Sequence, residues 1–69
     1  MHTYEITIYN KTVRELVHDG ESHKRYTDDW ADSHYIEFEA NSEAEAVEKC
    51  GRKYPGHDGF IIEQVALAA

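Results

Sequence analysis

The sequence of this 69-residue chain lacks several features that particular protein classes require. Its only cysteine, Cys50, allows neither an internal disulfide nor a zinc site built from several cysteines. No apolar run approaches the roughly 20 residues that a membrane-spanning helix needs. The first residues also lack the basic and then apolar layout of a signal peptide. We therefore expect a cytoplasmic protein that is not bound to a membrane.

Lysine and arginine are scarce relative to the acidic residues. Seven basic residues stand against 14 acidic residues, so the net charge is −7 when the histidines are neutral. Nucleic acid phosphates repel a chain of this charge, so direct DNA or RNA binding is not expected. The length and the hydrophobic content of 41% indicate one small folded domain, residues 1–69, with a thin core.

The shortage of basic residues is concentrated in the middle third of the chain. Residues 26–48 contain no Lys or Arg and eight acidic residues, namely Asp28, Asp29, Asp32, Glu37, Glu39, Glu43, Glu45 and Glu48. The remaining residues are close to neutral in sum. Two interpretations stay open: a solvated surface that keeps a small protein soluble, or a binding surface for a basic partner.

Alternating apolar residues predict strands over residues 3–9 and 34–40. In the second segment, Tyr35, Glu37 and Glu39 are expected to point away from the core. Residues 12–18 are few and follow a turn at Asn10-Lys11, so a hairpin partner strand is expected there, although the spacing of Val13 and Val17 is helical. The apolar residues of 60–67 do not alternate strictly, which predicts a strand buried on both faces and therefore central.

One helix is predicted between Ser42 and Pro55. Ser42 followed by Glu45 three residues later is a capping box, and Pro55-Gly56 ends the helix. Its buried arc is expected to hold Ala44, Val47, Cys50, Gly51 and Tyr54. A glycine on this arc predicts a close approach of helix and sheet.

The element order is strand, strand, strand, helix, strand. This order predicts an α+β domain with a small, mostly antiparallel sheet of three to four strands and one helix packed on one face. The last strand is expected to lie beside the first. Glu37 and Glu39 should then lie on the sheet face away from the helix. Glu45 and Glu48 should lie on the outer surface of the helix. The acidic segment 26–48 therefore contributes to two surfaces.

Residues 19–33 are polar and rich in turn-forming residues. Thr27–Asp32 is expected to form one short helical turn with Thr27 as its N-cap. Trp30 in this segment has two interpretations. Its ring either folds back over the edge of the core or remains exposed as an anchor for a partner protein.

Catalytic patterns are not evident in the sequence. Cys50 falls on the buried helix arc, where a thiol behaves as a small hydrophobic group. His18 and His23 flank a turn that contains Asp19, but their spacing matches no zinc pattern. No glycine-rich phosphate loop or nucleophile elbow is present. We therefore expect no enzyme activity, no cofactor and no metal site, and a protein that works by binding.

The segment Ala40-Asn41-Ser42-Glu43-Ala44-Glu45-Ala46, followed by Tyr54-Pro55, is similar to a strand–helix junction common in short phage proteins. In size, acidity and general layout the chain resembles small acidic phage-encoded anti-CRISPR proteins. The resemblance carries no diagnostic motif and transfers no site residue. It implies a non-catalytic inhibitor in the bacterial cytoplasm. Such an inhibitor binds a basic, DNA-binding surface of the type I CRISPR Cascade complex and blocks target DNA.

The candidate contact residues are five acids and two aromatics, namely Asp28, Asp29, Asp32, Glu37, Glu39, Trp30 and Tyr35. Alternate residues on a strand lie about 6.8 Å apart, which is on the scale of a backbone phosphate ladder. The inhibitor is expected to be a monomer. Two other functions stay open: a small accessory module that binds a regulatory protein, with ordinary surface acidity, and a structural homodimer formed through an exposed sheet edge.

Overall fold

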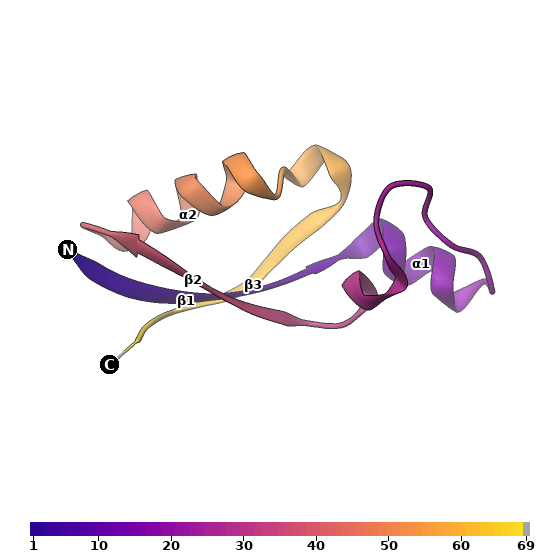
Figure 1. The fold of residues 1–69 in the computed structure, drawn as a ribbon, viewed down its shortest axis with the longest axis horizontal. Helices are drawn as coiled ribbons and strands as arrows, with labels where there is room; N and C mark the ends of the chain where they lie inside the picture. Colours follow the sequence, from indigo (N-terminus) through magenta and orange to yellow (C-terminus); the bar gives the residue numbers. More distant parts are fainter. Residues whose placement is uncertain (69) are drawn as a thin grey trace.

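The computed structural model describes residues 1–68 and confirms the α+β class. One antiparallel sheet contains β1 (His2–Asn10), β2 (His34–Ala40) and β3 (Phe60–Leu67) (Figure 1). The helices are α1 (Lys11–His18) and α2 (Glu43–Lys53), with short 3₁₀ turns η1 (Asp28–Ala31) and η2 (Gly56–Asp58). Ala69, the last residue of the expected domain, lies outside the described residues. Across residues 1–68, no helix has the length and apolarity needed to cross a membrane.

The central strand of the sheet is β1, because the strand order is β2-β1-β3. Its pairing with β2 runs without interruption from His2 opposite Ala40 to Ile8 opposite His34. The expected pairing of the last strand with the first is confirmed, but the prediction that the last strand is central is wrong. The register of β1 and β3 shifts beside Thr7 and Ile8. The imperfect alternation of β3 therefore reflects an irregular edge strand and not burial on both faces.

Residues 12–18 are not the expected hairpin strand, because Lys11–His18 form α1. The side chain of Asn10, which is fully buried, provides the N-cap of this helix. Its Oδ1 accepts the N–H of Val13 at 3.0 Å, and its Nδ2 donates to the backbone oxygen of Asp58 at 3.0 Å. Asn10 therefore starts a helix where the sequence predicts a hairpin turn.

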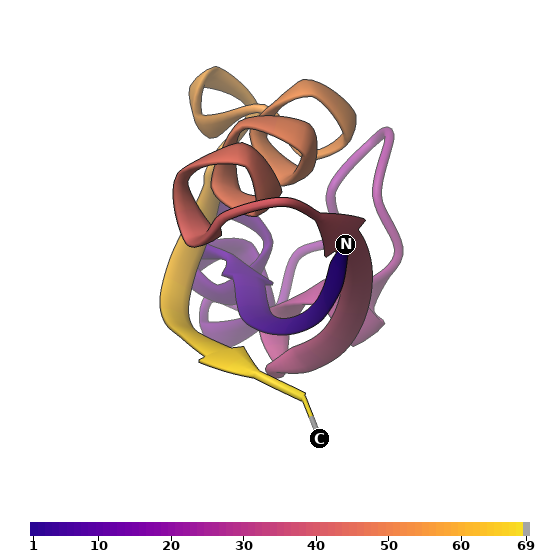
Figure 2. The ribbon, with the colours of Figure 1, turned by 90° about the vertical axis from the view of Figure 1, so that its left-hand side faces the viewer.

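The core lies between the sheet and α2, which covers one sheet face (Figure 2). Its buried residues are Ile6, Ile8, Ala40, Ala46, Cys50 and Phe60. The hydroxyl of Ser42 accepts the N–H of Glu45 at 3.2 Å, which confirms the predicted start of the helix.

The buried arc of α2 is rotated from the predicted one. Ala46 and Cys50 are buried, whereas Ala44 and Gly51 are exposed. A Cβ atom added to Gly51 would meet nothing within 4 Å, so the predicted close approach at this glycine is wrong. Alanine and glycine carry little hydrophobic driving force, and so they define the direction of a helix face poorly.

An aromatic cluster closes the core at the C-terminal end of α2. The ring centroid of Trp30 lies 5.1 Å from that of Phe60 and 5.2 Å from that of Tyr54. The same ring stacks on His34 at 4.1 Å. The expected turn is present as η1, although Thr27 makes no side-chain cap hydrogen bond. Trp30 thus folds over the core edge, as the first interpretation of its position predicted.

Candidate functional site

The sheet face opposite α2 is not covered by that helix (Figures 1 and 2). Side chains alternate along a strand, and Ile6 and Ile8 point into the core. Thr3, Glu5 and Thr7 therefore point to the opposite side, which we call the open face. Their register partners on β2 are Glu39, Glu37 and Tyr35.

The outward direction of the three β2 residues agrees with their exposure. Tyr35, Glu37 and Glu39 are exposed, whereas the intervening Ile36 and Phe38 pack against the core. The predicted alternation of this strand is confirmed. The prediction that Glu37 and Glu39 lie away from the helix is confirmed as well.

Carboxylates gather on the open face without basic partners. Glu5 lies directly opposite Glu37, an arrangement in which two like charges repel across paired strands. We place Glu63 of β3 on this side as well, because its carboxylate accepts a hydrogen bond from the hydroxyl of Ser33, two residues before Tyr35. Within residues 1–68, no basic side chain lies within ion-pair distance of these carboxylates or of Glu39.

The acids of α2 are in a different electrostatic situation. Glu45 pairs with Lys49 at 3.5 Å, and Glu48 pairs with Arg52 at 3.1 Å. These pairs neutralise part of the outer helix surface. The acidic residues of segment 26–48 are therefore divided between a helix surface with ion pairs and an open face whose carboxylates form none within residues 1–68.

The three candidate aspartates lie apart from the open face. Asp28 and Asp29 are in η1 and Asp32 follows it, at the end of the sheet where β2 begins (Figure 1). All three are exposed. A basic group is close to this turn, because Arg14 Nε donates to the backbone oxygen of Ala31 at 2.8 Å. The structure thus separates the candidate acids into two groups.

The two candidate aromatics have different surroundings. Trp30 is half-buried in the aromatic cluster and is occupied in covering the core. Tyr35 is 68% exposed and lies two residues from Glu37 on the same face. Of the two rings, Tyr35 is the one available to a partner of the open face.

Sequence reasoning missed Glu5 and Glu63 as members of this acidic surface. The alternation in residues 3–9 already directed Glu5 outward. Only the pairing of β1 with β2, however, shows that it lies opposite Glu37. The position of Glu63 depends on the irregular register of β3, which no local sequence pattern defines.

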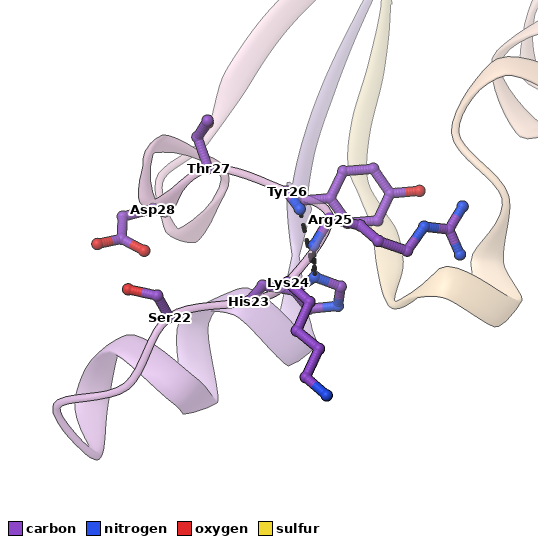
Figure 3. A pocket seen from close by; sticks show the side chains of 7 residues that line it. All are labelled: Ser22, His23, Lys24, Arg25, Tyr26, Thr27 and Asp28. Carbon is purple, nitrogen blue, oxygen red and sulfur yellow. Dashed lines mark hydrogen bonds between the residues drawn. The ribbon is translucent and has the colours of Figure 1, made fainter.

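The loop before η1 forms a second surface feature, a shallow pocket (Figure 3). It is lined by Ser22, His23, Lys24, Arg25, Tyr26, Thr27 and Asp28. His23 Nδ1 accepts the backbone N–H groups of Arg25 and Tyr26 at 3.0 and 3.3 Å. This ring therefore shapes the loop. In the part of the chain that the structure describes, no group of three or more His, Cys, Asp and Glu side chains is arranged to hold a metal ion.

Two titratable side chains have shifted proton affinities. Tyr26 Oη donates to Asp58 Oδ2 at 2.8 Å, and this hydrogen bond, followed by desolvation, raises the pKa of the phenol. Burial raises the pKa of the Cys50 thiol, which packs in the core. Both shifts are explained by structural contacts.

No protein-family model, no curated protein and no solved structure matches this chain. The open face presents carboxylates that form no ion pair within residues 1–68, together with one exposed tyrosine. Such a surface attracts cationic groups by charge and adds a flat aromatic contact.

Proposed function

We propose that this chain is a non-catalytic binding protein whose open face covers a basic, nucleic-acid-binding surface of another protein. The observation that carries the proposal is the placement of Glu5 opposite Glu37 without a basic neighbour. Like charges across paired strands destabilise the sheet. A basic partner removes this repulsion on binding, so the energy stored in the free protein favours the complex.

The class resemblance supplies the candidate partner, the type I CRISPR Cascade complex in the bacterial cytoplasm. Glu37 and Glu39 are alternate residues of one strand, about 6.8 Å apart, and their carboxylates replace DNA phosphates in contacts with Lys and Arg. The protein acts as a monomer and excludes target DNA by its bulk and its charge.

The test is a competition between the protein and target DNA for purified Cascade loaded with its guide RNA. We expect the wild-type chain to prevent DNA binding in a gel-shift assay. Glu37→Gln with Glu39→Gln should raise the concentration needed by about tenfold or more, because two charged contacts are lost.

The matched control is Glu45→Gln with Glu48→Gln, which changes the net charge equally on the helix surface. This control should inhibit like the wild type. Equal inhibition by both double variants would show that the open face is not the binding surface. Absence of inhibition by the wild type would remove Cascade as the partner.

A second candidate function has one observation in its favour. The exposure of Tyr35 fits an accessory module that binds a regulatory protein through aromatic contacts. Binding of that kind persists when salt screens surface charges. A complex that is insensitive to salt but lost in Tyr35→Ala would favour the accessory module.

A further inference from the structure

The outer edge of β2 has backbone groups that the sheet does not use. β2 lies at one side of the sheet and β3 at the other, with β1 between them (Figure 2). Two hydrogen bonds show which groups of β2 point outward. Thr3 O accepts the N–H of Ala68 at 2.8 Å, so the Thr3 backbone is directed toward β3. Its partner Glu39 is therefore in a pair without β1–β2 hydrogen bonds.

The second hydrogen bond confirms this assignment from the other side. Glu39 O accepts the ammonium of Lys49 at 2.6 Å, so this carbonyl points away from β1. Hydrogen-bonding direction alternates along a strand. The backbone N–H and C=O of Tyr35 and Glu37 point to the same outer edge. No hydrogen bond from another segment of residues 1–68 reaches them.

The edge of β2 lacks several of the features that prevent further pairing, although Glu37 and Glu39 place like charges along it. It contains no proline and no lysine, and its pairing with β1 has no register shift. Lys49 covers only the carbonyl of Glu39 at one end. β3, in contrast, is irregular beside Thr7 and Ile8. The β2 edge is therefore the regular template for an added strand.

The side chains of β2 define which strand fits this edge. A strand added there places its side chains about 4.5–5.5 Å from those of Tyr35, Glu37 and Glu39. In a second copy of this chain paired antiparallel about Glu37, two Glu37 carboxylates would face each other, which disfavours a homodimer through this edge. A partner with Lys or Arg at alternate positions would instead pair with the glutamates and stack on Tyr35.

We propose that the β2 edge binds an extended segment of the partner protein, with basic residues at alternate positions, as an additional strand of the sheet. This inference deepens the proposed function and rests on it, because it states how the basic partner is held. Backbone hydrogen bonds provide the alignment, and the alternate basic residues provide selectivity.

The first test uses a capped peptide, Lys-Thr-Lys-Val-Lys-Thr-Lys, which equals β2 in length. NMR titration should show that the peptide protects the amides of Tyr35 and Glu37 from hydrogen exchange. The control peptide has the same sequence with N-methyl groups on alternate amides, which keeps its charge and blocks strand pairing. The control peptide should bind at least about tenfold more weakly than the unmethylated peptide. Equal binding of the two peptides, or no protection of these amides, would overturn the added strand.

The second test changes the protein and keeps its acidic residues. Tyr35→Pro removes an N–H that points outward and is not needed for pairing with β1, a position that proline tolerates in an edge strand. Tyr35→Ala is the control, because it removes the same ring and keeps the N–H. Tyr35→Pro should bind the peptide about tenfold more weakly than Tyr35→Ala. Equal affinities would contradict the inference.

The DNA competition with Glu37→Gln and Glu39→Gln, which leaves the backbone edge intact, reports separately on the proposed function.

Discussion

Single residues fix the junction where β1, α1 and η2 meet. Asn10 caps α1 and also donates to the backbone of Asp58. Gly59 follows with φ of +101°, and its backbone oxygen accepts the N–H of Lys11 at 2.7 Å. A Cβ atom on Gly59 would lie 2.5 Å from Thr12 Oγ1 and 2.7 Å from Asn10 Oδ1. This glycine is therefore required both by backbone conformation and by space.

The two glycines Gly59 and Gly51 should respond in opposite directions to alanine. Gly59→Ala should lower the free energy of unfolding by about 2–3 kcal/mol, because of the positive φ and the clash. Gly51→Ala should raise it by about 0.5–1 kcal/mol, since the helix gains a better helix former in open space. Urea unfolding followed by circular dichroism measures both. Destabilisation by Gly51→Ala would instead support the close approach of helix and sheet that the sequence predicts at this glycine.

The hydrogen bond between Tyr26 and Asp58 predicts a pH effect. The pKa of the phenol is raised in the folded chain. The folded chain therefore holds this proton more tightly than the unfolded chain does. The stabilisation is complete below the ordinary tyrosine pKa of about 10 and is lost as the pH rises through the higher folded value. Asp58→Asn should move the Tyr26 titration toward lower pH, because it removes the carboxylate that favours the protonated phenol.

Ultraviolet absorbance of tyrosinate measures this titration, and the difference from Tyr26→Phe assigns it to Tyr26 among the five tyrosines. Identical titration of Tyr26 in the wild type and in Asp58→Asn would show that another group shifts its pKa. Urea unfolding of Asp58→Asn at neutral pH checks that the variant is folded.

At the level of elements, local patterns predicted the strands over 3–9 and 34–40 and the start of α2. In each case the signal is a strict alternation or a capping residue, and the structure places them as expected. The pattern was misleading where a local signal had two meanings. Asparagine favours turns, which is why the sequence predicts a turn at Asn10, but it also caps helices. The alternation of β3 was disturbed by a register shift that depends on its pairing with β1.

Local sequence patterns also predict part of the candidate site, but not the contacts that depend on tertiary structure. The outward direction of Tyr35, Glu37 and Glu39 follows from alternation within one strand. The position of Glu5 opposite Glu37 follows from strand register, which depends on tertiary structure. Trp30 had no periodic neighbours, and only the packed aromatic cluster decides between its two interpretations.

The pairing of β1 with β2 predicts a difference between two neighbouring glutamates. Glu37→Gln should raise the free energy of unfolding by a few tenths of a kcal/mol up to about 1 kcal/mol, because it removes the repulsion from Glu5. Glu39→Gln, whose partner is the neutral Thr3, should change stability less. The gain from Glu37→Gln should shrink at high salt. Equal effects of the two substitutions in urea unfolding would show that the Glu5–Glu37 repulsion is insignificant.

The whole molecule is slender, with principal extents of 42, 21 and 14 Å. A single helix, α2, covers one face of the sheet, so the chain has a thin core and the opposite face lies away from that helix. The net charge of −7 is unevenly placed on this shape. Ion pairs neutralise part of the charge of α2, whereas the carboxylates of the open face form no ion pair within residues 1–68. The acidic charge that is not compensated by ion pairs therefore lies mainly on the sheet face away from α2.

The dependence of Kd on salt concentration, measured for purified Cascade with the wild type and with Glu37→Gln plus Glu39→Gln, tests the account most directly. An acidic face that replaces DNA phosphates predicts tight binding at low salt and steep weakening of the wild type as salt rises. The double variant should bind more weakly at low salt and show a flatter dependence, and the two curves should converge at high salt. Parallel curves of equal slope would contradict the claim that these carboxylates make the contact.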